Sequence, residues 1–287
     1  NKLLQGKGLC IYKDIACKRV LLYQNGTTKH CLQKRLCQSE LSIPLATVIL
    51  DLSKFFREAA AVTAQQVQIG NRPCRIYGEA HTEYLLLQMT GEHELQSMDH
   101  EVTAIAQSGR NFLFSAVPVK NWNDELSPWE APAVWGKESF GGNAADTLCF
   151  LTEQVIPALK QQFALPRNVR IVLGGYSLAG LFALWASTQI ALFSGVAAAS
   201  PSVWFPGWMK FEQQYPIQAQ CIYLSLGDRE ERTRNATMAA VGENIRALHR
   251  ELAERRKSCV LEWNIGGHFK DTDLRTAKAF GWVMEDM

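Results

Sequence analysis

The sequence lacks the features that mark several large classes of protein. Its 287 residues contain no apolar run long enough to cross a bilayer, no internal repeat and no low-complexity tract, and the start of the chain shows no secretory signal. The 30 basic and 28 acidic side chains leave a formal net charge of +2, which gives no reason to expect a nucleic-acid partner. We therefore expect a cytoplasmic globular protein with neither membrane nor nucleic-acid partners, and its oligomeric state stays open.

Close cysteine pairs of the C-x-x-C type are also missing, although the chain contains eight cysteines. Structural zinc sites usually carry such pairs, so we predict no metal site, and nothing else in the sequence indicates a cofactor. Cys221 and Cys259 begin apolar runs, and we expect both to be small buried core residues. Reduced thiols agree with a cytoplasmic location.

The first 64 residues are predicted to be an N-terminal extension, because their composition differs from that of the rest. Residues 1–40 contain eight basic and only two acidic side chains. They also hold four of the cysteines, but the spacing fits no familiar zinc pattern, so we expect a poorly ordered segment rather than a metal-binding module. Over residues 42–57, apolar side chains recur on one helical face, which predicts a helix that packs on the following domain or covers its site as a lid.

The most informative segment is Arg170–Ala186, which places Ser177 between an apolar strand and an apolar helix. A serine that attacks a carbonyl must stand clear of the sheet on a sharp turn with small neighbours. Gly175 and Ala179 are those neighbours, although the usual G-x-S-x-G pattern has glycine where this chain has Ala179. The pattern predicts a nucleophile elbow at Ser177, and the alternative is an ordinary strand-to-helix connection with a capping serine.

A serine nucleophile needs a base, and the base needs a group that fixes its tautomer. Downstream of Ser177, strands are predicted over Cys221–Gly227 and Cys259–Asn264, and His268 follows the second of them after two glycines. Carboxylates follow the first, so the chain order is Ser, acid, His, which is that of the α/β-hydrolase fold. These positions lie after the carboxyl ends of strands, where open α/β sheets build their sites. His268 is therefore the predicted general base.

The acid is harder to select, because Asp228, Glu230 and Glu231 share one loop. Hydrolases commonly place the acid three residues after the glycine that ends the strand, and this favours Glu230. Asp228 and Glu231 stay open as alternatives. A run of charges can equally be a solvated loop with no catalytic role.

Five segments carry a resemblance to a known family, the putative esterase family of α/β hydrolases, which includes siderophore esterases, feruloyl esterases and esterase D-like enzymes. They are Trp122–Ala133, Phe140–Asn143, Gly174–Ala183, Ala199–Phe205 and Gly266–Asp271. The resemblance extends from about Arg72 to the end of the chain. It implies hydrolysis of a small-molecule carboxylic ester through an acyl-enzyme, with Ser177 as nucleophile and His268 as base. The substrate does not follow, because members of the family differ in it.

Acyl transfer also needs two backbone N–H groups that stabilise the oxyanion. We expect the first from Leu178, which follows the nucleophile. The second should come from the loop after the third strand of the fold, which we assign to Phe112–Val117, and Trp122 or Asn121 is the predicted donor. Trp204 is predicted either to wall the acyl pocket or to belong to the core.

Residues 65–287 are predicted to form an α/β-hydrolase domain with a mostly parallel sheet of seven or eight strands, helices on both faces, and antiparallel pairing near the N-terminal edge. Further strands are expected over 66–70, 73–78, 83–90, 111–117, 169–174 and 195–200, and helices over 95–107, 145–163, 244–257 and 272–287. The leading function is a serine carboxylesterase. An acyltransferase would use the same elbow, and a catalytically silent binding module would keep only the fold.

Overall fold

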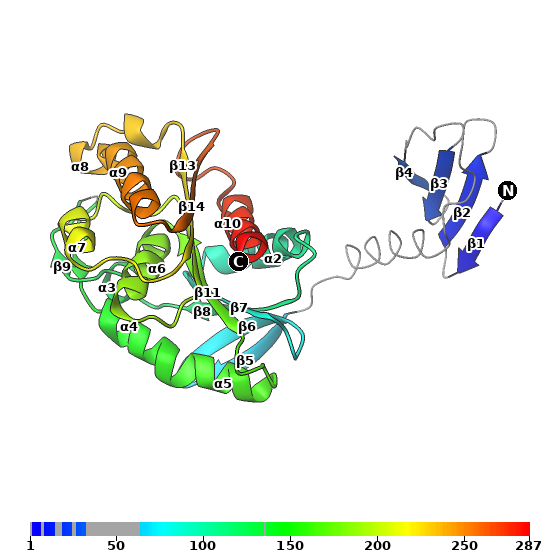
Figure 1. Cartoon of the computed structure of the whole chain (residues 1–287), viewed down its shortest axis with the longest axis horizontal. Coiled ribbons are helices and arrows are strands. Elements are labelled where there is room, and N and C mark those ends of the chain that lie inside the picture. Colours follow the sequence, from blue (N-terminus) through cyan, green and yellow to red (C-terminus); the bar gives the residue numbers. More distant parts are fainter. Residues whose placement is uncertain (1, 7–8, 15–18, 25–26, 33–63, 135) are drawn as a thin grey trace. The chain divides into compact units, whose positions relative to one another are not determined.

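The computed structural model describes residues 2–6, 9–14, 19–24, 27–32, 64–134 and 136–287 (Figure 1). The chain divides into two compact units, Asn1–Arg57 and Glu58–Met287, and each is described by itself. The helix expected over residues 42–57 lies outside the described residues. The predicted boundary after residue 64 directly follows this undescribed stretch, and it stays a prediction.

The first unit contains a four-stranded antiparallel sheet in the order β1-β2-β3-β4. Its strands are β1 (Lys2–Gly6), β2 (Leu9–Asp14), β3 (Arg19–Gln24) and β4 (Thr27–Leu32). The sequence analysis expected little regular structure here, and that expectation was wrong for these residues. The missed signal is local: the sequence Asn25-Gly26 follows the run RVLLYQ, and Asn-Gly is a strong hairpin signal.

The second unit is built on an eight-stranded sheet in the order β14-β13-β12-β11-β7-β8-β6-β5. Strand β6 is antiparallel to both of its neighbours, β5 and β8, and the other adjacent pairs are parallel. The mostly parallel sheet and its antiparallel edge are therefore confirmed. The strands are β5 (Gln65–Ile69), β6 (Arg72–Gly78), β7 (Tyr84–Thr90), β8 (Phe112–Pro118), β11 (Arg170–Tyr176), β12 (Gly195–Ala199), β13 (Cys221–Gly227) and β14 (Ser258–Asn264).

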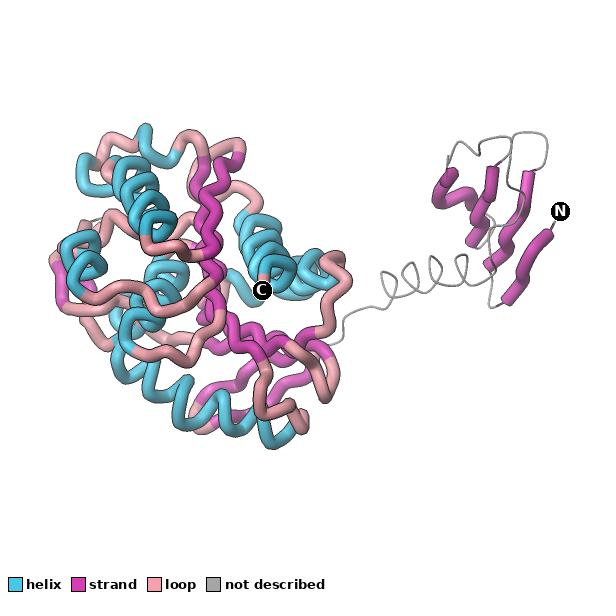
Figure 2. Tube along the Cα trace, in the orientation of Figure 1, coloured by secondary structure: helices cyan, strands magenta, loops and turns pink. Residues whose placement is uncertain are grey.

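The central strands are buried along their whole length because helices cover both faces of the sheet. Every residue of β7, β12 and β13 is buried. Helices α2 (Met98–Ala106) and α10 (Thr272–Asp286) pack on one face, and α6 (Leu178–Gln189) and α9 (Val241–Glu254) on the other (Figures 1 and 2). The remaining helices are α3 (Trp122–Glu125), α4 (Ala144–Phe150), α5 (Ile156–Gln162), α7 (Trp208–Gln214) and α8 (Ala236–Ala239), and β9 (Glu130–Ala131) pairs with β10 (Phe140–Gly141).

The helix expected over residues 145–163 forms as α4 and α5, joined by a π-helical stretch over Leu151–Val155. Pro157 lies in the first turn of α5 and has no N–H to donate to the preceding turn. Irregular helical turns occur at prolines, and π-helical turns occur as short insertions within α-helices. The predicted element is therefore present, and its irregularity follows from one residue.

The cysteines of the second unit include both core candidates. Cys221 is buried at the start of β13, as expected, whereas Cys259 is partly buried and packs against the core from the edge strand β14. None of the helices in the described part of the chain combines the length and the hydropathy that a bilayer crossing requires.

The two phenylalanines near the end of the chain provide a matched test of the core. Phe280 is fully buried on α10 and packs edge-on against Phe114, whereas Phe269 is 88 % exposed. We expect Phe280→Ala to lower the free energy of unfolding by about 3–5 kcal/mol because it leaves a cavity, and Phe269→Ala to change it by less than about 0.5 kcal/mol.

Urea unfolding of the full chain, followed by tryptophan fluorescence, measures this difference in the second unit. All eight tryptophans lie there, the first at position 122 and the last at 282. Equal stability losses in the two variants would contradict the described packing of α10.

Candidate active site

Ser177 lies on a strained turn between β11 and α6. Its backbone angles are φ 57° and ψ −118°, a region that residues other than glycine rarely adopt. A Cβ atom at Gly175 would lie 2.7 Å from the Cβ atom of Ala179, closer than two non-bonded carbon atoms can approach. The small residues on either side of Ser177 are therefore required by the close approach of helix and strand, as the sequence pattern predicts.

His268 links Ser177 to a carboxylate. Its Nε2 atom lies 2.9 Å from the Ser177 Oγ atom, and its Nδ1 atom lies 2.7 Å from the Glu230 Oε2 atom. The Glu230 side chain is only 5 % exposed, and that of His268 is 23 % exposed. Hydroxyl, imidazole and carboxylate thus form one continuous hydrogen-bonded chain, in which Ser177 and His268 are partly exposed and the carboxylate is nearly inaccessible.

The three carboxylates of the acid loop have different partners. Glu230 alone contacts His268, while the Asp228 carboxylate accepts a hydrogen bond from the Gly266 N–H at 2.8 Å. Glu231 forms an ion pair with Arg246, with 2.9 Å between Oε2 and Nη1. The geometry thus favours Glu230 over both alternatives, because each of these two carboxylates has another partner.

Two serines that the sequence analysis gave no role lie against the site. Ser200 donates a hydrogen bond from Oγ to the Glu230 Oε1 atom at 2.8 Å. The Ser202 Oγ atom lies 3.3 Å from the Ser177 Oγ atom, and the Ser202 N–H donates to the Ser177 carbonyl at 3.0 Å. Ser200 has a positive φ of 43°, so a second strained residue follows β12 beside the first. Ser200 and Ser202 follow the carboxyl end of β12, and this position could have identified them as candidate site residues from the sequence.

Tyr176 and Arg275 were also missed, although Tyr176 directly precedes Ser177. The Tyr176 hydroxyl donates to the His268 carbonyl at 2.6 Å. Burial, together with the negative charge of Glu230, raises the pKa of Tyr176 to about 12, so its hydroxyl keeps its proton at neutral pH. Arg275 is buried beside both Tyr176 and Glu230.

The predicted source of the second oxyanion donor needs a correction. The third strand of the sheet in chain order is β7, which pairs directly with β11, whereas Phe112–Pro118 is β8 and lies one strand further away. The Asn121 N–H is engaged with the Glu125 carboxylate at 2.9 Å. Trp122 stays a prediction, and the loop that begins at Gly91, directly after β7, becomes a second candidate source.

The predicted strands over 66–70, 73–78 and 83–90 already made 83–90 the third in chain order, so the assignment of the third strand to Phe112–Val117 was wrong. Leu178 is the first residue of α6, where backbone N–H groups have no partner within the helix. Its placement agrees with the role expected for it, which stays a prediction.

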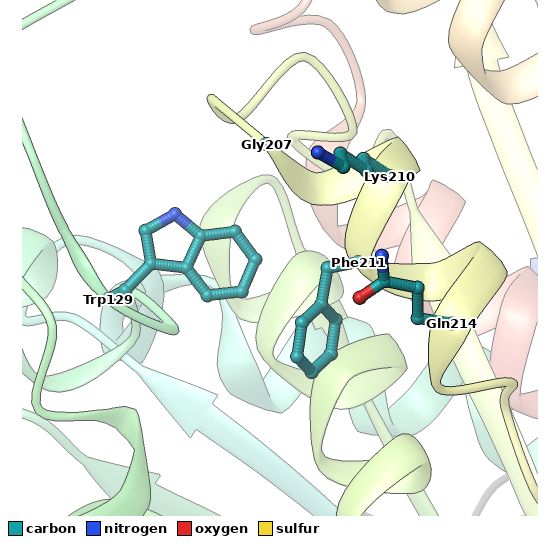
Figure 3. Close-up of a pocket in the computed structure, with 5 residues that line it drawn as sticks. All are labelled: Trp129, Gly207, Lys210, Phe211 and Gln214. Atoms are coloured by element: carbon teal, nitrogen blue, oxygen red, sulfur yellow. The ribbon is translucent and has the colours of Figure 1, made fainter.

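Trp204 packs against the core, and its alternative role as a wall of the acyl pocket stays a prediction. Trp204 is partly buried and packs near Phe140, with 6.2 Å between the ring centroids. A hollow of about 260 Å³ lies beside Trp129, and Figure 3 shows the residues around it. Its lining consists of Trp129, Gly207, Lys210, Phe211 and Gln214, and it includes none of Ser177, Glu230 and His268.

Solved structures share the fold of this chain. An IroE-like serine hydrolase from Shewanella oneidensis superposes with a TM-score of 0.66 at 15% identity, covering 78% of this chain and 81% of that one. The siderophore hydrolase EstA from Aspergillus nidulans gives 0.58 at 18% identity, with 88% and 99% covered. The enterobactin esterase FES from Shigella flexneri, in the presence of enterobactin, gives 0.61 at 17% identity, with 78% and 59% covered. At these identities, the likeness establishes the fold alone.

Family membership comes from the sequence. A comparison with curated proteins gives no match. The family model described as "Putative esterase" matches residues 88–268, which is more than half of the chain. The matched range begins in β7 and ends at His268, so it includes Ser177 and Glu230 as well. The chain therefore belongs to the putative esterase family and is a carboxylic ester hydrolase.

Proposed function

We propose that this protein is a serine esterase that cleaves small-molecule esters through an acyl-enzyme on Ser177. The observation that carries the proposal is the 2.9 Å contact between the Ser177 Oγ and His268 Nε2 atoms, on a turn that holds the serine clear of the sheet. Such a contact allows the imidazole to take the hydroxyl proton as the oxygen attacks.

In the first half-reaction, Ser177 Oγ attacks the ester carbonyl while His268 Nε2 accepts its proton. Glu230 faces the opposite nitrogen of the ring at 2.7 Å, so it holds the Nδ1–H tautomer and stabilises the imidazolium that forms. The imidazolium then protonates the departing alcohol. Glu230 stays ionised throughout, since its role is to orient and to stabilise charge.

The tetrahedral intermediate places a negative charge on the former carbonyl oxygen. The Leu178 N–H, at the start of α6, is the proposed first donor to this oxyanion, and the positive end of the helix dipole favours the same charge. The proposed second donor is a backbone N–H from one of two loops, that of Trp122 or that after β7. Only Leu178 is common to both arrangements.

In the second half-reaction, His268 takes a proton from water, which attacks the acyl carbon. The bond from the acyl group to Ser177 Oγ then breaks, the imidazolium returns its proton to that oxygen, and the acid leaves. Before the attack, the Ser202 Oγ atom lies 3.3 Å from the Ser177 Oγ atom, close enough to hydrogen-bond the free hydroxyl. The similar structures include enzymes whose names refer to enterobactin and other siderophores. Siderophore-like lactones therefore belong in the first substrate panel, together with simple acyl and aryl esters.

Three substitutions test the assigned roles. Ser177→Ala and His268→Ala should each lower kcat/KM for an activated short-chain ester by at least about 10³-fold, because each removes a reacting group. Glu230→Gln should cost less, about 10²-fold, since the base remains. Steady-state kinetics on the full chain measure these losses, and circular dichroism shows whether each variant is folded. Substantial activity in Ser177→Ala would refute the assignment of the nucleophile.

The choice of acid has its own matched control. Asp228→Asn removes the same charge two residues away in the same loop and keeps an oxygen that can accept the bond from the Gly266 N–H. We expect its kcat/KM to stay near that of the unaltered chain, while Glu230→Gln loses activity. A larger loss in Asp228→Asn than in Glu230→Gln would transfer the role to Asp228.

Hydrolysis and acyl transfer share the first half-reaction, so the products must separate them. With water and a competing primary alcohol both present, we expect the free carboxylic acid to be the main product. Chromatographic product analysis measures the ratio, with Ser177→Ala as the blank. If the new ester predominates at low alcohol concentration, the protein is an acyltransferase.

A further inference from the structure

Arg275 is a buried cation that the reaction described above does not use. It belongs to α10, on the face of the sheet opposite α6, and it is only 4 % exposed. A buried charge is costly unless it is paired and hydrogen-bonded, and all of the partners of Arg275 lie around the active site. Its Nη1 atom lies 3.2 Å from Glu230 Oε1 and 3.1 Å from the Tyr176 hydroxyl, and its Nη2 atom donates to the Ile265 carbonyl at 3.2 Å.

The two oxygens of Glu230 have separate partners. Oε1 accepts hydrogen bonds from the Gly227 N–H at 2.7 Å, from Ser200 Oγ at 2.8 Å and from Arg275. Oε2 faces His268 Nδ1. The terminal torsion of a glutamate is broad and would allow the carboxylate to rotate. Three donors on one oxygen prevent that rotation, so the other oxygen stays directed at the histidine.

Tyr176 extends the same network to the backbone of the histidine. Its hydroxyl accepts from Arg275 Nη1 and donates to the His268 carbonyl at 2.6 Å. Because Tyr176 directly precedes Ser177 at the end of β11, this side chain connects the nucleophile's strand to the loop that carries the base. Ile265, bonded to Nη2, is the first residue after β14 and lies in the same loop as His268.

We propose that Arg275 is a positioning residue of the esterase. It orients the Glu230 carboxylate toward His268. Through Tyr176 and Ile265, it also holds the loop that carries His268 in place beside Ser177. The inference rests on the proposed function. Arg275 touches no reacting atom, so it is not a catalytic residue. Its effect is on the geometry of the two groups that prepare Ser177.

The site requires the forked geometry of arginine as well as its charge. The Nη1 atom hydrogen-bonds Glu230 and Tyr176, and the Nη2 atom hydrogen-bonds the Ile265 carbonyl. A lysine has one ammonium group and cannot reproduce this fork. The space around the guanidinium group is tight, because a Cβ atom at Gly227 would lie 3.1 Å from Arg275 Nη1 and 2.8 Å from Glu230 Oε1.

The test compares Arg275→Met and Arg275→Lys with a control of the same chemistry elsewhere. Arg255 pairs with the fully buried carboxylate of Glu212, on helices that supply none of the proposed site residues. Arg255→Met therefore also leaves a buried glutamate without its arginine. Each variant is assayed as the full chain for kcat, KM and stability to urea.

We expect Arg275→Met to lower kcat at least about tenfold with KM changed less than about threefold, because positioning acts on the chemical step. Arg275→Lys should recover part of the loss, since it restores the charge without the fork. Arg255→Met should lose stability but keep kcat within about twofold. A folded Arg275→Met with unchanged kcat, or an equal loss of kcat in Arg255→Met, would overturn the proposal.

Two further measurements keep the test decisive. If Arg275→Met does not fold, Arg275→Lys and Tyr176→Phe take its place, and unchanged kcat in both would overturn the role. Proton NMR follows the His268 Nδ1–H without any turnover, with the resonance assigned by its loss in His268→Ala. We expect this resonance to broaden by solvent exchange in Arg275→Met but not in Arg255→Met. An unchanged resonance counts against Arg275, whereas a wild-type chain without esterase activity counts against the proposed function.

Discussion

The close approach of α6 to β11 is the constraint on which the rest of the site depends. At the turn between them, Ser177 adopts a backbone conformation that few side chains accept, and the residues two before and two after it have no room for larger side chains. The close approach extends to Gly180, where a Cβ atom would lie 3.0 Å from the Gly175 carbonyl oxygen and 3.2 Å from the Cβ atom of Pro201. Because Pro201 separates Ser200 from Ser202, the packing around the Ser177 turn also places both of these serines beside it.

A second constraint is the balance of buried charge at the carboxyl edge of the sheet. Glu230 carries a negative charge in a nearly inaccessible position, and its neighbours supply N–H and O–H donors together with one cation. Without Arg275, the burial of this carboxylate would be much more costly. The arginine comes from α10, which covers one face of the sheet. This one helix therefore both completes the core and pairs with the buried charge of Glu230. The proposed positioning role of Arg275 therefore couples stability and activity at this position.

Much of this organisation could be predicted from residues close together in sequence. The pattern around Ser177 indicated a strand, a tight turn and a helix, and the structure has all three in that order. The alternation of apolar runs with amphipathic helices predicted the parallel sheet, because each run is long enough for a strand and too short for a helix. His268 followed from its position after the last strand. The antiparallel sheet of residues 2–32 was missed, although Asn25-Gly26 was a local signal for it.

What the sequence alone determined is the identity of the elements and the order of serine, carboxylate and histidine along the chain, because these depend on local periodicity and on the fixed direction of parallel strands. Tertiary structure decided which of three neighbouring carboxylates faces His268, since the loop turns Glu230 inward and leaves Asp228 and Glu231 to other partners. It also decided that β7, and not β8, lies beside the nucleophile's strand. The contact between Arg275 and Glu230 could not be predicted, because 45 residues separate them in sequence and no local pattern indicates a contact between such distant segments.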